Sequence, residues 1–142
     1  MITFQRNQVV GAEFLDDNII RFNGVQEDHI YGMEISMEVS IKEGKILQIS
    51  GNMKRYTNFV CPQAISVLPK AVGLSLREAD WDKKVMREIG RLGCEHLAEI
   101  IIECDRCLNS AVLSRDLKKA LMENPGLDQE EFLKEIKKEV SV

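Results

Sequence analysis

The chain has 142 residues, 44% of them hydrophobic and 30% charged, which is typical of one globular domain with its own core and excludes a disordered chain. Its nineteen basic and twenty-three acidic residues give a net charge of −4 without a sustained Lys or Arg run, which argues against a nucleic-acid partner. No apolar run approaches the ~20 residues of a membrane span, and no signal-peptide core opens the chain, so we expect a cytoplasmic protein without a membrane partner.

The N-terminal half carries the period of β-strands. Residues 7–15 and 19–25 flank the turn residues 16–18, which predicts a first hairpin. A second hairpin is expected from residues 33–41 and 46–53, because apolar and polar side chains alternate along both segments. The expected inward residues are Met33, Ile35, Met37, Val39 and Ile41 in the first of these segments, with Leu47, Ile49 and Met53 in the second.

After residue 60 the pattern changes to that of helices. Pro62 suits a first helical position, so we expect a helix from Cys61 to Gly73, with Pro69 as a possible kink. Ser75 or Asp80 can start a short helix that carries Trp81, Val85 and Ile89 and ends at Gly90 or Gly93. A long helix is then predicted from about Cys94 to Val112.

Two more helices are expected at the C-terminus. Ser114 can cap the first, and the last begins with a capping box of Asp128 and Glu131. Strands followed by helices predict an α+β fold, an antiparallel meander of three to four strands covered by helices. We expect one domain at residues 1–112 and a helical extension at residues 113–142 that packs on it or on a partner.

Four cysteines and two histidines are the candidates for chemistry. Thiols in a reducing compartment are ligands, reactive groups or core residues. Cys104 and Cys107 form a CxxC pair inside the long helix, but no second pair of that spacing exists, so packing is favoured over zinc binding. Cys61 and Cys94 each lie at a predicted helix start, where N–H groups and the helix dipole stabilise a thiolate.

The two histidines have a functional and an ordinary interpretation. His96 lies in the same first turn as Cys94 and could join its site, whereas His29 lies in a loop between strands. Both could equally be surface residues. The chain has no glycine-rich phosphate loop and no hydrolase motif, and its carboxylates are too scattered to identify a general acid and base.

The residues Cys61–Pro62, Gly73–Leu74, Trp81 and the segment 93–99 (GCEHLAE) resemble a bacterial family of unknown function, DUF2889, over roughly residues 5–112. The family implies no activity. The chain also resembles the iron–sulfur cluster assembly scaffolds of the IscU and NifU type in its order of hairpin, strand, cysteine, helix and a later helix that begins with Cys and His. This second resemblance implies an IscU/NifU-like fold and a pocket for zinc or an iron–sulfur cluster formed by Cys61, Cys94, His96 and His29.

Two classes of function stay open, and a third ranks last. The first is a small metal-binding protein with a scaffold-like or delivery role, in which Cys61, Cys94 and His96 converge. The second is a non-enzymatic interaction module whose C-terminal helices bind a protein partner or a second copy through Leu117, Leu121, Phe132, Ile136 and Val140. The third is a thiol enzyme with Cys94 and His96, which is disfavoured because residues two apart on a helix point in different directions.

Overall fold

The computed structural model describes residues 1–140, with the side chains of residues 139 and 140 outside the description. The chain divides into two compact units, Met1–Asp105 and Arg106–Val142. In this described part of the chain, no helix combines the length and the apolar character that a bilayer span needs.

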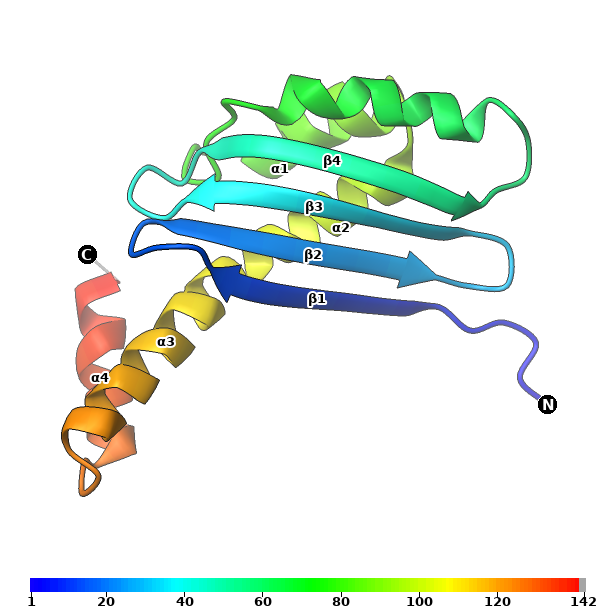
Figure 1. Ribbon diagram of the computed structural model, residues 1–142. Helices are drawn as coiled ribbons and strands as arrows, with labels where there is room; N and C mark the ends of the chain where they lie inside the picture. The colour runs from blue at the N-terminus through cyan, green and yellow to red at the C-terminus, as the bar shows by residue number, and fades with distance from the viewer. Residues whose placement is uncertain (141–142) are drawn as a thin grey trace. The chain divides into compact units, whose positions relative to one another are not determined.

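An antiparallel sheet of four strands in sequential order forms the first half of the first unit (Figure 1), which confirms the predicted meander. The first turn is held by the Asp16 carboxylate, which accepts hydrogen bonds from the backbone N–H groups of Asn18 and Ile19, both at 2.7 Å. The strands are β1 (Asn7–Phe14), β2 (Ile19–Glu27), β3 (Gly32–Ser40) and β4 (Ile46–Arg55).

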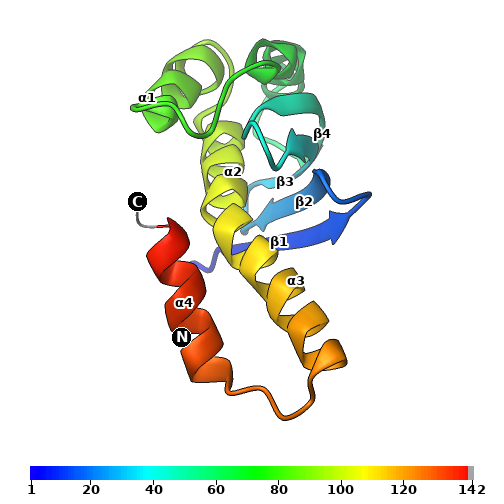
Figure 2. The same cartoon turned by 90° about the vertical axis from the view of Figure 1, so that its left-hand side faces the viewer.

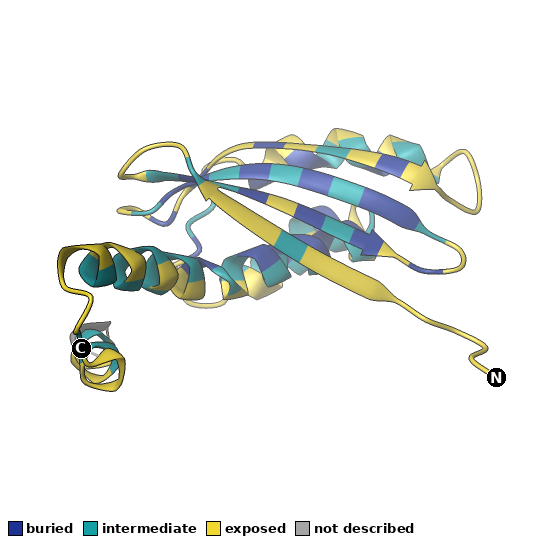
Figure 3. Ribbon diagram, turned by 60° about the horizontal axis from the view of Figure 1, so that its bottom comes forward, coloured by how far each residue is buried: buried dark blue, intermediate teal, exposed yellow. Residues whose placement is uncertain are grey.

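In β2, β3 and β4 one face is buried and the other is more exposed, whereas β1 has no buried residue (Figure 3). Met33, Ile35, Met37 and Val39 are all buried on β3. The expectation for Ile41 is wrong, because β3 ends at Ser40 and Ile41 is only partly buried in the turn, where its N–H donates to the Asn18 carbonyl.

The expected inward position of Leu47 is also wrong. Glu38 pairs with Gln48, but the next residue, Val39, pairs with Ile46, so Leu47 is the extra residue of a β-bulge. Leu47 is therefore 43% exposed, and Ile46 is buried in its place. Ile49 and Met53, beyond the bulge, face inward as predicted.

Helical segments cover the apolar face of the sheet (Figure 1). They are the 3₁₀-helix η1 (Cys61–Ala71), α1 (Trp81–Val85), the π-helical segment η2 (Met86–Arg91) and α2 (Glu95–Arg106). A Cβ atom on Gly24 of β2 would lie 2.4 Å from Ile100 Cγ2, and one on Gly51 of β4 would lie 2.7 Å from Leu68 Cδ1. The two glycines therefore let α2 and η1 approach the sheet closely.

The helices differ from the predictions at three points: Pro69, the end of the long helix, and Ser114. Pro69 lies inside η1, which winds with the tighter i→i+3 bonds of a 3₁₀-helix; the Val72 N–H donates to the Pro69 carbonyl at 3.1 Å. The long helix predicted from Cys94 to Val112 ends at Arg106, and Cys107 separates it from the next helix. Ser114 lies inside that next helix instead of capping it.

The second unit contains a helical hairpin formed by α3 (Leu108–Glu123) and α4 (Gln129–Val140) (Figure 2). The predicted cap of α4 is present, since the Glu131 N–H donates to the Asp128 carboxylate at 3.2 Å. Between α3 and α4 the chain turns at Asn124, whose side-chain oxygen accepts a hydrogen bond from the Gly126 N–H at 3.2 Å.

Candidate functional site

A pocket of about 170 Å³ contains three of the four residues predicted to form a metal site. The strands β3 and β4 contribute apolar side chains to its wall, while η1 and the start of α2 contribute the sulfur and imidazole groups. The thiols of Cys61 and Cys94 belong to half-buried residues. The lining residues are Tyr31, Met33, Met53, Asn58, Val60, Cys61, Ala64, Gly93, Cys94 and His96.

Cys61 is the first residue of η1, as predicted, and Pro62 follows it. Its Sγ lies 3.7 Å from Thr57 Oγ1 and 3.7 Å from Asn58 Oδ1. The hydroxyl of Thr57 and then the backbone at Asn58 hold the pKa of Cys61 below its ordinary value, against the opposing effect of burial. Cys61 is therefore the more readily ionised kind of thiol that nucleophiles and metal ligands require.

Cys94 and His96 enter the pocket from the beginning of α2. The Cys94 N–H donates to the Ile89 carbonyl at 3.0 Å, and its own carbonyl accepts from the Ala98 N–H at 3.2 Å, which fixes the backbone at the helix start. The side chains come together because Cys94 Sγ lies 4.0 Å from His96 Nδ1. A thiol and an imidazole nitrogen thus face each other at one side of the cavity.

Tyr31 connects the two sides of the pocket. Its ring packs against the His96 ring, with centroids 4.7 Å apart and planes tilted by 45°. Its hydroxyl lies 3.4 Å from the Thr57 hydroxyl, which in turn contacts the Cys61 thiol. Sequence reasoning missed Tyr31 and Thr57, because single residues in two separate loops carry no spacing signal.

The turn that carries Tyr31 is held by a buried carboxylate. Asp28 accepts from the backbone N–H of Tyr31 at 2.6 Å and of Ile30 at 2.7 Å, and from Arg6 Nε at 3.1 Å. The Tyr31 N–H, followed by the Ile30 N–H and Arg6, lowers the pKa of Asp28 to about 2 despite its desolvation. Asp28 is therefore ionised at neutral pH and fixes the backbone at Tyr31.

His29 does not line this pocket. Its ring instead meets the edge of Phe4, with centroids 6.0 Å apart and an interplanar angle of 73°. Among residues 1–140, no group of three or more His, Cys, Asp or Glu side chains is arranged so that it could hold a metal ion. The pocket thus gathers Cys61, Cys94 and His96 without His29.

The other two cysteines lie outside this pocket. Cys104 is fully buried in α2, where its sulfur faces β2, 3.2 Å from the point that a Cβ on Gly24 would occupy. Cys107, between α2 and α3, is half-buried. The expectation that both are at least partly buried is confirmed.

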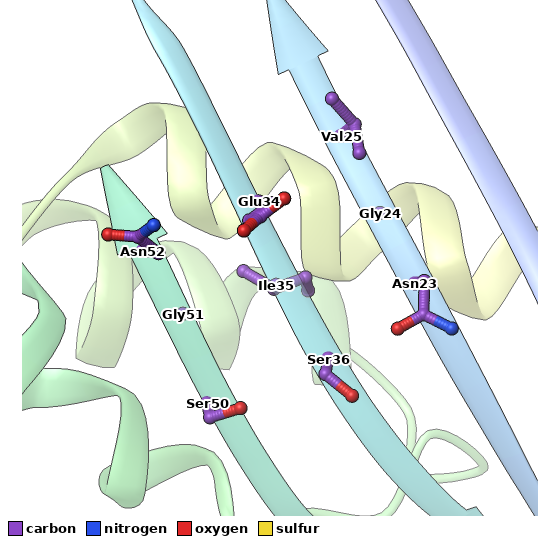
Figure 4. Close-up of a pocket in the computed structure, with 9 residues that line it drawn as sticks. All are labelled: Asn23, Gly24, Val25, Glu34, Ile35, Ser36, Ser50, Gly51 and Asn52. Carbon is purple, nitrogen blue, oxygen red and sulfur yellow. The ribbon is translucent and has the colours of Figure 1, made fainter. Parts of the chain in front are cut away.

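A second and larger hollow, of about 280 Å³, lies on the polar face of the sheet (Figure 4). It runs across β2, β3 and β4, where Asn23, Ser36 and Ser50 are neighbours in the register. The carboxylate of Glu34, on its border, forms an ion pair with Lys54 at 3.3 Å. The hollow offers amide and hydroxyl groups, and it contains neither a thiol nor an imidazole.

The fold and the first pocket define an α+β protein with thiol and imidazole groups at one end of a four-stranded antiparallel sheet. The chain belongs to the family described as proteins of unknown function, DUF2889, which matches residues 7–108. This match confirms the first resemblance and includes the whole sheet and every residue that lines the pocket. No curated protein and no solved structure matches the chain, so the scaffold-like order of motifs has no support from these comparisons.

Proposed function

We propose that the pocket binds a soft divalent metal ion, with zinc as the best match, through Cys61, Cys94 and His96. The observation that carries this proposal is that two thiols and an imidazole from segments far apart in sequence line one small cavity. Sulfur and imidazole nitrogen are the ligands that zinc prefers in proteins.

One pair of side chains lies at nearly the separation that a shared ion requires. Zinc–sulfur bonds near ~2.3 Å and zinc–nitrogen bonds near ~2.0 Å place two ligands of a tetrahedral ion roughly 3.5 Å apart. Cys94 Sγ and His96 Nδ1 are 4.0 Å apart, so a small side-chain adjustment brings both onto one ion. Cys61 lines the same cavity, and we expect it to become the third ligand by changing its χ1 rotamer when the ion binds.

The cavity also leaves room for a fourth ligand. Its volume of about 170 Å³ exceeds the ~30 Å³ that one water molecule occupies in the liquid. Three protein ligands with one open position characterise zinc that binds an exogenous ligand, whereas structural zinc has four protein ligands. This favours a metal-binding or delivery role over a purely structural ion.

The lowered pKa of Cys61 supports metal binding, because a thiol must lose its proton to become a ligand. Thiolates are also the usual ligands of iron–sulfur clusters, so a cluster is the second candidate for the same three residues. The two candidates differ in colour, since zinc is spectroscopically silent and a cluster absorbs visible light.

Metal analysis of the tag-free full-length chain, purified anaerobically with a reductant, tests the proposal. We expect one zinc ion per chain after zinc loading and removal of excess metal. Cys61→Ser, Cys94→Ser and His96→Gln should each weaken zinc binding about tenfold or more in competition with a chromophoric chelator, since a serine hydroxyl stays protonated where a thiol ionises.

Two matched controls distinguish the pocket from unspecific binding. Cys107→Ser removes a thiol outside the pocket, and His29→Gln removes the other histidine, so both should retain the affinity of the wild type. Zinc below one-tenth of an equivalent in the loaded wild type would overturn the proposal. Equal losses in the pocket variants and the two controls would do the same.

A further inference from the structure

The edge strand β1 exposes every one of its residues in whole or in part. None of the first fifteen residues of the chain is buried, and β1 is exposed along most of its length (Figure 3). Val10 and Ala12 lie on the side of the sheet that the helices cover, because they pair with the buried residues Gly24 and Phe22 of β2. Even so, Val10 is only half-buried and Ala12 is exposed. Within one chain, the apolar layer of the sheet is therefore incomplete at β1.

The outer edge of β1 also carries backbone groups without a strand to bind. The Leu15 N–H donates to the Ile19 carbonyl at 2.8 Å, and successive residues of an antiparallel strand alternate between bonding the neighbouring strand and facing away from it. Counting along the register from this bond, the backbone groups of Gln8, Val10 and Ala12 face away from β2. Since β1 has β2 as its single neighbour in the sheet, these three residues present their N–H and C=O groups at the edge.

The two edges of the sheet differ in how they are protected. At the other edge, β4 has the bulge at Leu47 and the charged residues Lys54 and Arg55. Bulges and charged side chains are the means by which sheet proteins prevent pairing at an edge. β1 has an unbroken register with no proline and no lysine, and its single charged residue is Glu13. β1 is therefore the edge that is open to another strand.

We propose that β1 pairs antiparallel with β1 of a second copy of this chain, across a two-fold axis at Val10. The edge groups determine this register, because Val10 is the middle one of the three residues that face outward. Val10 of one chain then bonds Val10 of the other, and Gln8 of each chain bonds Ala12 of the other. All the edge N–H and C=O groups of these residues are used. The side chains of Val10 and Ala12 lie on the same side in both copies, which completes the apolar layer.

The open face of the sheet favours a second copy over an unrelated strand. Val9 faces that side and is 62% exposed. In this register Val9 of each chain lies directly opposite Gly11 of the other. The space above Gly11 is open, since a Cβ atom there would meet only the Asn23 carbonyl oxygen, at 4.0 Å. One strand thus carries both the exposed side chain and the open space, two residues apart, and the two-fold axis matches them twice.

The charges at the contact are compatible with this pairing. Glu13, the charged residue of β1, lies opposite the side-chain amide of Asn7 of the other copy, so no like charges meet along the strand. Glu13 also keeps its ion pair at 3.1 Å with Arg21 of its own chain, because Arg21 lies on β2, away from the contact. Arg6, just before β1, likewise keeps its ion pair with Asp28 at 3.1 Å.

Sedimentation equilibrium of the full-length chain, over a wide concentration range and with a reductant, tests the pairing. We expect a reversible dimer of twice the 16.2 kDa chain mass. Val10→Pro removes the N–H at the two-fold axis but no bond to β2, and proline is tolerated on edge strands. It should weaken the dimer about tenfold or more, because two hydrogen bonds are lost. Val10→Thr keeps the N–H and the branched shape, so this matched control should retain the dimer.

An introduced thiol tests the register. Opposite residues that bond each other in antiparallel strands have Cα atoms about 5.5 Å apart, which a disulfide spans. Val10→Cys should therefore give a disulfide-linked dimer in a glutathione redox buffer. Ala12→Cys is the matched control, because its two thiols would be offset by four residues along the strands, about 13 Å, which is too far for a disulfide. Peptide mass spectrometry identifies the linked residues, and circular dichroism shows whether each variant is folded.

The outcomes decide the proposal. A wild-type chain that stays monomeric throughout the range overturns it, and so does a folded Val10→Pro variant that dimerises with wild-type affinity. Linkage through Ala12→Cys without linkage through Val10→Cys overturns the register. If Val10→Pro does not fold, a lack of linkage through Val10→Cys overturns the pairing instead. None of the residues that line the metal pocket precedes Tyr31, so zinc binding and dimerisation can fail independently.

Discussion

Gly93 is the position where a single methyl group should disturb both the fold and the pocket. A Cβ atom at this residue would lie 2.3 Å from Val67 Cγ2, 3.0 Å from the Ile89 carbonyl oxygen and 3.3 Å from the Ala64 carbonyl oxygen. The side chain of Val67 can rotate away from the new methyl group. The carbonyl oxygens of Ile89 and Ala64 belong to the backbone, so the backbone itself must shift away from the methyl group. Gly93→Ala should therefore separate η1 from the segment that leads to Cys94.

The expected cost of this overpacking is about 1–3 kcal/mol of unfolding free energy. For a chain of this length it corresponds to a melting temperature lowered by roughly 3–10 °C. Because Cys61 and Cys94 lie on the two segments that separate, zinc affinity should fall in the same variant.

Denaturant unfolding and the chelator competition measure the two effects, with Gly11→Ala as the control. A Cβ atom at Gly11 would meet only the Asn23 carbonyl oxygen, at 4.0 Å, so this variant should match the wild type in both assays. A Gly93→Ala protein with wild-type stability and zinc affinity would refute the reasoning, because it would show that the contact between the two segments is not tight.

Two further predictions concern the groups that shape the pocket. Thr57→Val removes the hydroxyl that lowers the pKa of Cys61, so alkylation of the Cys61 thiol should require a higher pH than in the wild type. Mass spectrometry of the Cys61 peptide measures this pH profile. An unchanged profile would exclude the role of Thr57. Asp28 has a pKa lowered from 3.8 to about 2, so its ionised form contributes stability above pH ~4 that is lost as the pH falls toward 2. Asp28→Asn should consequently be less stable than the wild type at pH 7. In thermal unfolding, the difference in melting temperature between the two proteins should shrink between pH 5 and pH 2. A constant difference across this range would contradict the role of Asp28.

The sequence predicts the sheet well where its period is unbroken. Along β3, strict alternation of apolar residues with Glu and Ser gives only one register with an apolar face, and Met33 to Val39 follow it. The bulge at Leu47 was not predictable, because Ile46 and Leu47 are equally apolar and only pairing with β3 decides which one is buried. The break at Cys107 also lacks a signal, since neither Gly nor Pro marks it.

The candidate site was partly predictable for a different reason. Pro62 marks a helix start and Gly93 marks the end of the helix before Cys94, so the positions of Cys61 and Cys94 near helix starts follow from neighbouring residues. Which loop residue reaches the pocket depends instead on the turn between β2 and β3. Asp28 holds that turn with Tyr31 against His96, while His29 packs with Phe4, and neither contact has a signature in the sequence.

The β-bulge at Leu47 has a consequence for how the length of this chain can vary. Pairing on one side of the bulge joins Glu38 with Gln48, and on the other side it joins Val39 with Ile46. Deletion of Leu47 would turn the bulge into a regular ladder while keeping both of these pairs. The deletion would change β4 only near the bulge, and Met53, the β4 residue that lines the pocket, lies farther along the strand. A chain one residue shorter at this point can therefore keep the same pocket.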